Sequence, residues 1–437
     1  MDSSSKKKKY PRTVLIGNEY QESCPPSDIK NPIITLKGHN GNVVFDNDRL
    51  SKGVLLIGAP GCGKTTLTTE MTDQIIPQMT PDDIMVIFDT KGDYIEKFYY
   101  SNNPSHILVS PTDISGIASS WSTFGETFDE NGFFSEKSFL YAHEISKGLF
   151  KGLESQTQPF FHIAASDIFK MILWCVLIDA IESGDLGRAN NSTLSEILED
   201  PSVSRIYEMA ERHPEFKYIK GYLGNPEKPT TQSLGILGYL NAMFSTQYVG
   251  SFKKFYGKPF SIRSLIRNKG AKIVFIKYDI TFGELLSPVY SLLYDLAIKE
   301  ALSIGKGNTY FICDEMQLLP YCNSFKNVTN FGRGRGVKLI AGFQNINQLY
   351  ANYGVNEGKS IAAGFANVLC FNSYDDDTRQ FMRDRLGRTF ECFSFASTNI
   401  PHDGYTINDG DFRSFLPGEA IVDIPGEMPF KFRLKMN

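Results

Sequence analysis

Short runs of consecutive apolar residues alternate along the chain with segments of helical periodicity. Such runs are typical of strands that are buried on both faces of a parallel sheet. They lie on both sides of a long central segment, at residues 53–57, 84–88, 272–278, 308–313, 338–342, 367–371 and 420–424. Helical segments between several of them include residues 64–74 and 285–302. The pattern predicts an α/β fold built on a doubly wound, mostly parallel sheet.

The central segment has a different pattern, because its periodicity is helical and its β-branched runs disappear from about residue 134 to 246. Apolar residues recur at spacings of three and four on one helix face: Phe161, Ala164, Ala165, Ile168, Ile172 and Cys175. We therefore expect an all-α insertion at residues 131–250. It divides the α/β domain into residues 31–130 and 251–437, and a polar, poorly ordered tail covers residues 1–30.

Composition excludes several classes of protein. The 437 residues are 41% hydrophobic and 22% charged, which is ordinary globular usage and excludes disordered, collagenous and coiled-coil chains. The net charge of -4 excludes a uniformly basic surface but allows a local one. The seven cysteines are scattered and form no C-x-x-C pair, and the six histidines form no H-E-x-x-H motif. A disulfide framework and a zinc site are not expected, and a reducing cytosol is the natural compartment.

The sequence offers no evident membrane-spanning or secretory segment. The longest apolar run, residues 171–178, is too short to span a bilayer. The lysines at residues 6–9 are not followed by an apolar stretch, so they do not belong to a signal peptide. We interpret them as a solvated tail, and contact with anionic lipid or nucleic acid is the alternative.

One glycine-rich segment carries the strongest chemical signal. Residues 58–65 match the pattern G-x-x-x-x-G-K-[ST], between a buried strand and a helix. In such a loop the backbone N–H groups surround phosphate oxygens, Lys64 bridges the β- and γ-phosphates, and Thr65 supplies a hydroxyl to Mg²⁺. We therefore expect ATP and Mg²⁺ as cofactors. The expected nucleotide-binding residues are Gly58, Ala59, Pro60, Gly61, Cys62, Gly63, Lys64, Thr65 and Thr66.

An acidic pair follows the predicted strand at residues 308–313. Asp314 is suited to hold the Mg²⁺ shell, and Glu315 is suited to orient and polarise an attacking water as general base. An Asp-Glu pair can also be a simple charge pair at a helix N-terminus. Together with the P-loop, however, it favours nucleotide hydrolysis.

A third group of residues surrounds the predicted strand at residues 338–342. Gln344 ends this strand, where its amide can sense the γ-phosphate; the alternative is that it caps the next helix. Arg333 and Arg335 lie in the glycine-rich loop before the strand. Glycine-flanked arginines near a subunit edge suit an arginine finger that acts on a neighbouring subunit.

Several of these segments resemble one known family. Residues 86–93, VIFDTKGD, resemble the D-x-K-G-[ED] element of the coupling proteins of type IV secretion and conjugation, which are DNA-transfer ATPases of the FtsK–HerA superfamily. Residues 332–354 are very similar to the family segment G-R-x-x-G…A-G-x-Q-[SN]-x-x-Q-L-x-x-x-Y-G. Residues 160–165 resemble the opening of the family's all-α domain, and residues 416–422 resemble its closing strand. The resemblance extends over about residues 30–437.

The resemblance implies a RecA-like P-loop domain with an inserted all-α domain. It makes Lys64 and Thr65 the Walker A pair, Asp314 and Glu315 the Walker B pair, and Gln344 the γ-phosphate sensor. Arg333 takes the place of the trans finger, with Arg335 the weaker candidate. Lys64, Glu315, Gln344 and Arg333 are then the catalytic residues, and Thr65 and Asp314 the metal ligands.

The resemblance also implies an assembly and a location. It predicts a homohexamer with DNA in a central channel, and a relaxase or secretion-channel proteins as further partners. The protein is expected in the cytoplasm, at the inner face of the membrane only through partners, because the family's N-terminal transmembrane helices are not evident. A second departure is Trp121-Ser122-Thr123-Phe124, which stands where the family commonly has W-N-P-[LF].

Two other functions compete with a DNA-pumping coupling ATPase. One is a HerA-like or viral genome-packaging motor, and the other is a nucleotide-gated adaptor that recruits protein substrates without moving DNA. The DNA contacts are weakly specified by sequence. Residues 253–258, KKFYGK, interleave basic and aromatic side chains as single-strand binding surfaces do, although exposed loops often share this composition.

Overall fold

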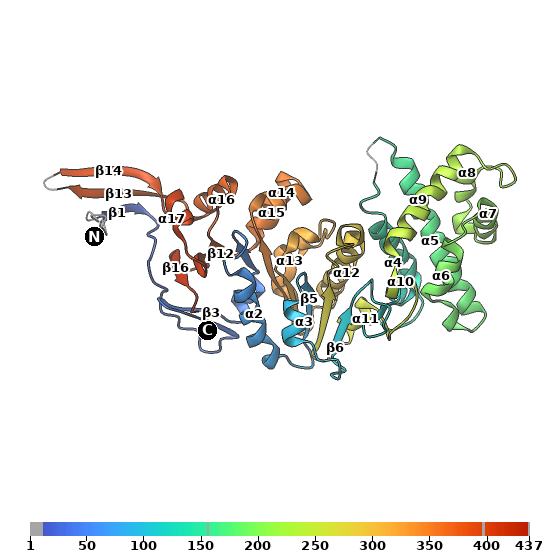
Figure 1. The fold of residues 1–437 in the computed structure, drawn as a ribbon, viewed down its shortest axis with the longest axis horizontal. Coiled ribbons are helices and arrows are strands. Elements are labelled where there is room, and N and C mark those ends of the chain that lie inside the picture. The colour runs from blue at the N-terminus through green and yellow to red at the C-terminus, as the bar shows by residue number, and fades with distance from the viewer. Residues whose placement is uncertain (1–11, 155–156, 396–397, 436–437) are drawn as a thin grey trace. The chain divides into compact units, whose positions relative to one another are not determined.

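The structure is a computed structural model, and it describes residues 12–154, 157–395 and 398–435. The chain forms two compact units (Figure 1). Unit 1 comprises Met1–Gln78 and Leu339–Asn437, and unit 2 comprises Met79–Lys338. The lysines at residues 6–9 lie outside the described residues.

Unit 1 contains parallel strands bordered by two antiparallel ones. Its main strands follow the order β16-β15-β12-β4-β11. The strands β12, β4 and β11 are parallel, whereas β15 and β16 are antiparallel. Two helices connect β11 to β12, which makes a β-α-β crossover of the expected kind. The bounds are β4 Val54–Ile57, α2 Lys64–Ile75, β11 Val337–Phe343, α14 Ile346–Tyr353, α15 Val355–Gly364, β12 Asn367–Phe371, α16 Asp376–Leu386, β15 Glu419–Asp423 and β16 Phe430–Arg433.

Unit 1 also contains two antiparallel additions that the apolar pattern did not predict. One is the hairpin β2-β3, and the other is a three-stranded sheet in the order β1-β13-β14. The prediction of a poorly ordered tail is therefore wrong for Arg12–Gly17, which form β1. The remaining bounds are β1 Arg12–Gly17, β2 Ile34–Gly38, β3 Gly41–Phe45, α1 Asn47–Ser51, β13 Arg388–Phe395, β14 Thr398–Tyr405 and α17 Asp409–Ser414.

Unit 2 contains four parallel strands in the order β10-β5-β9-β6. The long helix α12 connects β9 to β10, and α3 lies between β5 and β6 in the chain. The bounds of this part are β5 Ile84–Asp89, α3 Asp93–Phe98, β6 His106–Val109, β7 Ser120–Trp121, β8 Pro259–Phe260, α11 Ile262–Arg267, β9 Lys272–Lys277, α12 Gly283–Ile304, β10 Thr309–Cys313 and α13 Phe325–Phe331.

The segment between β7 and β8 contains only helices among its described residues. Its helices are α4 Glu136–Leu149, α5 Pro159–Glu182, α6 Asn191–Leu198, α7 Val203–Arg212, α8 Ile219–Leu223, α9 Thr231–Gln247 and α10 Gly250–Lys253. The helical content agrees with the sequence pattern. This segment belongs to unit 2 in the structure, so its independence as an inserted domain stays a prediction.

Helix α5 has 24 residues and is therefore longer than the apolar run at residues 171–178 that it contains. Of the helices in the described residues, only this one has the length and hydropathy that crossing a membrane requires. However, 72% of its most apolar window is buried inside the protein, as in the core helix of a folded domain.

The seven strands that the apolar runs predict are all present, as β4, β5, β9, β10, β11, β12 and β15. The reason is burial: each residue of β4, β5, β10, β11 and β12 is buried. A strand that is apolar on both faces can be recognised without knowledge of its neighbours.

Candidate nucleotide-binding site

The glycine-rich loop in unit 1 has the backbone of a phosphate-binding loop. It begins after β4 and ends where Gly63 precedes α2. Gly61 and Gly63 have φ values of 74° and 106°, which side chains with a Cβ rarely adopt. Gly58 has a different constraint, because a Cβ there would lie 2.6 Å from the Cβ of Phe371. The glycines of the motif are therefore required by the shape of the loop.

The side chain of Lys64 is held over the loop by hydrogen bonds to the backbone of the loop. Its Nζ donates hydrogen bonds to the carbonyl oxygens of Gly58 at 2.6 Å and Ala59 at 3.2 Å. The side chain is buried, whereas Thr65, one residue into α2, is half-buried. Burial raises the pKa of the neighbouring thiol of Cys62. This places an ammonium group and a hydroxyl at the start of a 12-residue helix, as phosphate and Mg²⁺ binding require.

Two segments distant in sequence support the loop. The N–H of Ala59 donates to the carbonyl of Asn372, which follows β12, at 2.8 Å. The N–H of Gly418 donates to the carbonyl of Cys62 at 2.9 Å. A Cβ at Gly63 would lie 3.4 Å from the nitrogen of Gly418. Residues 416–422 were predicted only as a closing strand, and their contact with the P-loop was not predicted.

Gln344 lies at the same edge of unit 1 as the P-loop. Phe343 at the end of β11 is paired with Ile57 at the end of β4, and its carbonyl accepts from the N–H of Gly58 at 3.2 Å. The N-cap of α14 is Asn345, whose side chain accepts from the N–H of Gln348. The backbone N–H of Gln344 donates to Gln348 Oε1 at 2.9 Å, and the role of its side chain as a γ-phosphate sensor stays a prediction.

The acidic pair lies in unit 2, directly after β10. Asp314 and Glu315 are 5% and 9% exposed. The hydroxyl of Tyr94 donates to Asp314 Oδ2 at 3.5 Å, and Gln317 Nε2 donates to Glu315 Oε1. Tyr94 and Gln317 were not predicted, because neither belongs to a motif of the catalytic residues. Tyr94 lies 220 residues from Asp314 in sequence, so the contact depends on strand pairing.

The D-T-K-G-D segment is the neighbour of the acidic pair. Strand β5 pairs in parallel with β10, with Ile87 opposite Ile312, so both strands end at the same edge. The carboxylate of Asp89 accepts from the N–H groups of Gly92 and Ile95, both at 2.8 Å. These contacts hold the turn into α3, although burial raises the pKa of Asp89. Asp89 is thus a structural residue of the turn, and it places Tyr94 beside Asp314.

Arg333 and Arg335 lie at the opposite edge of unit 2 from the acidic pair. Their short 3-10 helix, Gly332–Arg335, precedes Gly336, whose carbonyl accepts from the N–H of Thr309 at the start of β10. The five residues of β10 separate this edge from Asp314, which corresponds to about 17 Å at roughly 3.3 Å per residue. Both arginines are exposed, and Arg335 packs along Gly305 after α12. Neither arginine adjoins the acidic pair of its own unit.

The basic-aromatic segment 253–258 is also exposed in part. Lys254, Tyr256 and Lys258 are exposed, whereas Lys253 pairs with Glu199 at 2.6 Å. The backbone of this loop is fixed by Ser120, whose hydroxyl accepts from two consecutive N–H groups. The loop therefore exposes two lysines and one tyrosine to solvent. Its contact with DNA stays a prediction.

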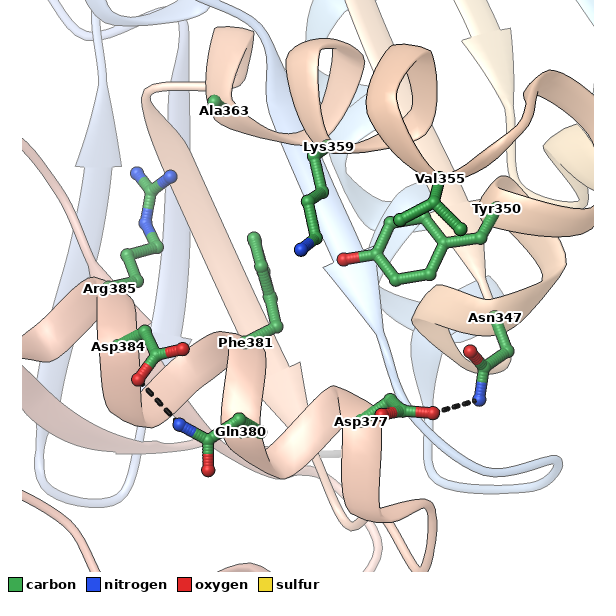
Figure 2. Close-up of a pocket in the computed structure, with 10 residues that line it drawn as sticks. All are labelled: Asn347, Tyr350, Val355, Lys359, Ala363, Asp377, Gln380, Phe381, Asp384 and Arg385. Carbon is green, nitrogen blue, oxygen red and sulfur yellow. Dashed lines mark hydrogen bonds between the residues drawn. The ribbon is translucent and has the colours of Figure 1, made fainter.

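A cavity of about 660 Å³ lies between α14, α15 and α16 of unit 1 (Figure 2). Figure 2 shows Tyr350 and Lys359 pointing into it, while Asn347 donates to Asp377 along its rim at 2.8 Å. None of the predicted nucleotide-binding residues lines this cavity. It is therefore separate from the P-loop.

The chain belongs to the family of type IV secretion-system coupling proteins. Residues 38–392 match the model of their DNA-binding domain. No curated protein matches the sequence.

Solved structures show the same fold. The bacterial conjugative coupling protein TrwBdeltaN70 is 18% identical, with a TM-score of 0.71 over 99% of this chain and 95% of that one. A structure of TrwB with ADP and Mg²⁺ gives a TM-score of 0.67 at 17% identity, over 99% of this chain and 96% of that one. VirB4 of Thermoanaerobacter pseudethanolicus gives 0.52 at 15% identity, over 97% of this chain and 99% of that one. The P-loop ATPase fold, with parallel strands flanked by helices, is therefore confirmed.

Proposed function

We propose that the protein is a DNA-stimulated ATPase that pumps DNA, or a relaxase–DNA complex, during conjugative or type IV secretion-like transfer. The observation that carries the proposal is the P-loop of unit 1, in which Lys64 and Thr65 begin a helix behind two left-handed glycines. TrwB, which shares the fold, has been solved with ADP and Mg²⁺ and with a non-hydrolysable ATP analogue. The same cofactors suit this chain.

Each predicted catalytic residue has a role in the proposed hydrolysis. In the proposed site, Lys64 and the loop N–H groups bind the phosphates, and Thr65 and Asp314 hold Mg²⁺. Glu315 polarises the attacking water, and Gln344 senses the γ-phosphate. Mg²⁺ supplies charge compensation between the β- and γ-phosphates when it is bound. The carboxylate of Glu315 already accepts a hydrogen bond from Gln317, which orients it.

The assembly that we propose is a homohexameric ring with DNA in its channel, on the cytoplasmic side of the membrane. The family model describes a DNA-binding domain, which supports DNA as the partner. The exposed Lys254, Tyr256 and Lys258 suit contact with the phosphates and bases of a single strand. A HerA-like or packaging motor has less support, because the matched model describes type IV secretion.

Purified wild-type protein and three variants test this function. Lys64→Ala should lose nucleotide binding and turnover, because it removes the charge that faces the phosphates. Glu315→Gln should still bind ATP but hydrolyse it roughly 10² to 10⁴ times more slowly, since general-base catalysis is worth about that much. Glu284→Gln, at an exposed site on α12, is the matched control and should behave like wild type.

The same preparations separate a DNA motor from a nucleotide-gated adaptor. The ATPase rate is measured against added single- and double-stranded DNA over a range of salt concentrations. A motor should be stimulated, and the stimulation should fall steeply with salt because phosphate contacts release counterions. An assembled, active protein that neither kind of DNA stimulates would support the adaptor.

A further inference from the structure

The cavity between α14, α15 and α16 of unit 1 has the size and the lining of a small-molecule site (Figure 2). Its volume is about 660 Å³. Sites for small ligands typically measure about 300 to 1,000 Å³ and combine apolar walls with a few polar groups. Because the lining side chains project from three helices, their positions are set by regular secondary structure.

Two aromatic rings form most of the apolar part of the cavity. Tyr350 projects from α14 and Phe381 from α16, and both side chains are half-buried. Val355 and Ala363 of α15 add smaller apolar groups. A half-buried ring keeps part of its surface accessible, so a planar ligand can stack on it.

One wall of the cavity supplies a cation. Figure 2 shows Lys359 of α15 pointing into the cavity, and no carboxylate of the described residues forms an ion pair with it. Arg385 also lines the cavity, but its guanidinium pairs with Asp423 at 2.6 Å and donates to the carbonyl of Ala366 at 2.8 Å. The ammonium group of Lys359 is therefore the one that an anionic ligand can reach.

The facing wall, α16, supplies two carboxylates. Asp377 and Asp384 are seven residues apart, which is two helical turns, so they lie on one face of the helix. Asp377 accepts from Asn347 at 2.8 Å, and Asp384 accepts from Gln380 at 2.5 Å. Each carboxylate has two oxygens and can accept further hydrogen bonds. This wall therefore suits a ligand that presents N–H donors.

The ligand must satisfy the rings, the lysine and the carboxylates together. A free phosphate or a simple acid would use only Lys359, and an organic cation would be repelled by it. We propose that this cavity binds a free guanine nucleotide. Its base stacks on Tyr350 and Phe381, its phosphate pairs with Lys359, and the N–H edge of the base donates to a carboxylate of α16.

The carboxylates select guanine over the other bases. Guanine has two adjacent donors, N1–H and its N2 amino group, and one carboxylate can accept from both. In adenine and cytosine the amino group adjoins a ring nitrogen that accepts hydrogen bonds, so a carboxylate is repelled there. The site differs in this respect from a P-loop, which binds phosphates through backbone N–H groups and does not read the base.

Calorimetric titration of the Lys64→Ala protein with guanosine monophosphate tests the proposal. In this background the P-loop lacks its phosphate-binding lysine, so the result does not depend on the proposed ATPase function. Guanosine monophosphate should bind at least about 10 times more tightly than adenosine monophosphate, since a bidentate base contact of this kind discriminates to that extent. Guanosine, which lacks the phosphate, should also bind more weakly.

Variants of the cavity assign each contact in the same background. Lys359→Ala should weaken binding of guanosine monophosphate roughly 10-fold or more and remove its advantage over guanosine, because a charge-assisted contact is lost. Phe381→Leu keeps an apolar side chain but loses the stacking surface, and should weaken binding several-fold. Of Asp377→Asn and Asp384→Asn, one should remove the preference for guanine.

The matched controls are Lys30→Ala and Asp28→Asn, at exposed residues of unit 1, and neither should change the affinity. Circular dichroism verifies that every variant is folded. Absence of guanosine monophosphate binding by the folded Lys64→Ala protein would overturn the proposal, and so would equal binding of the two monophosphates or full affinity in Lys359→Ala. An oligodeoxyguanylate that binds more tightly than the monophosphate would also overturn it, because the site would then belong to nucleic acid.

Discussion

A buried tyrosine hydroxyl donates a hydrogen bond to the carboxylate that we expect to bind Mg²⁺. Tyr94 is 1% exposed and donates to Asp314. A hydrogen bond to a metal-binding carboxylate orients that ligand, and the loss of such a partner typically costs about 10- to 100-fold in metal affinity. Tyr94→Phe should therefore raise the Mg²⁺ concentration required for half-maximal ATP hydrolysis, with a smaller effect at saturating Mg²⁺.

The control for this prediction is another buried tyrosine of unit 2. Tyr290 donates its hydroxyl to the carbonyl of Lys277 at 3.1 Å, away from the acidic pair. Tyr290→Phe loses a comparable buried hydrogen bond and should leave the Mg²⁺ dependence unchanged. An equal shift in both variants would mean that the effect comes from general loss of stability.

Two buried lysines should make the free energy of unfolding of unit 2 change with pH in the alkaline range. Desolvation lowers the pKa of Lys338 and of Lys269 to about 8. Lys338 donates to the Asn308 side chain, and Lys269 donates to the Asn308 carbonyl at 3.1 Å. Between pH 8 and about 10.5 each lysine is protonated in the unfolded chain but largely neutral in the folded protein. The unfolded chain therefore binds more protons than the folded one, so each lysine should make the free energy of unfolding rise with pH in that window.

Lys338→Met should reduce this pH dependence. Denaturant unfolding from pH 8 to about 10 should give a slope smaller than that of wild type by up to about 1.4 kcal/mol per pH unit. The difference between wild type and variant removes the opposing contribution of the tyrosines, which titrate in both. An unchanged slope would show that Lys338 does not lose its proton in the folded state.

Site residues could be predicted individually from the sequence where they belong to one short motif. The P-loop sequence determines its own backbone, since Gly61 and Gly63 occur where φ is positive. Contacts made by residues that belong to no catalytic motif were not predictable. Tyr94 and Gly418 reach the site only after strands or segments far apart in sequence have come together.

At the scale of the elements, one buried carboxylate of unit 2 connects strand β7 to the start of helix α11. Glu126 is fully buried and accepts from the indole of Trp121 at 3.0 Å, and from the N–H groups of Ile262 and Arg263 at the start of α11. Arg263 in turn pairs with Glu300 of α12 at 3.1 Å and with Glu144 of α4. The tryptophan segment therefore attaches the helices to the strands.

Glu126→Gln should destabilise unit 2 substantially. The amide replaces one acceptor by a donor that faces N–H groups, and it leaves Arg263 with less compensating charge. Removal of one partner from a buried charged network costs roughly 3 to 5 kcal/mol, measured as the free energy of unfolding in urea. Glu130→Gln breaks only the exposed pair with Lys137 and should cost less than about 1 kcal/mol. Equal effects of the two variants would refute the role of Glu126.

Strands, like site residues, could be predicted where a short stretch of sequence carries the signal by itself. Strands that are apolar throughout, such as β5 and β12, were predicted because burial on both faces leaves a continuous run. The three-stranded sheet β1-β13-β14 was missed because exposed faces impose no such pattern. In β13 the sequence RTFECFSF mixes polar and aromatic residues, and β1 lies within a segment that resembles a tail.

At the scale of the whole molecule, the two units each hold part of the expected catalytic set. The P-loop and Gln344 belong to unit 1, whereas Asp314, Glu315 and Arg333 belong to unit 2. The sequence predicted a different division, with the helical segment as the separate part. Hydrophobic patterns report which residues are buried but not how many long-range contacts join two segments, so they did not predict this division.

The last prediction concerns the arginine finger, which connects chemistry to assembly. Arg333 is exposed and follows Phe331, which is 64% exposed, at the edge of unit 2 away from Glu315. Five residues of β10 separate that edge from the acidic pair, so we expect a finger at Arg333 to meet a γ-phosphate on another subunit. Arg333→Ala should bind ATP and assemble normally but hydrolyse about 10³ to 10⁵ times more slowly, since such a finger stabilises charge on the transferred phosphoryl group.

Mixed rings distinguish a trans finger from any other role of Arg333. An Arg333→Ala subunit retains an intact P-loop, and a Lys64→Ala subunit retains an intact finger. Where the two variants adjoin in the productive order, an intact P-loop faces an intact Arg333, so mixing two nearly inactive proteins should restore part of the ATPase rate. Arg335→Ala is the matched control, because that side chain packs along Gly305 of its own unit and should be dispensable for the rate. If rings shown to contain both variants remain inactive, Arg333 does not act across the interface. If Arg335→Ala is the variant that is rescued, the finger is Arg335.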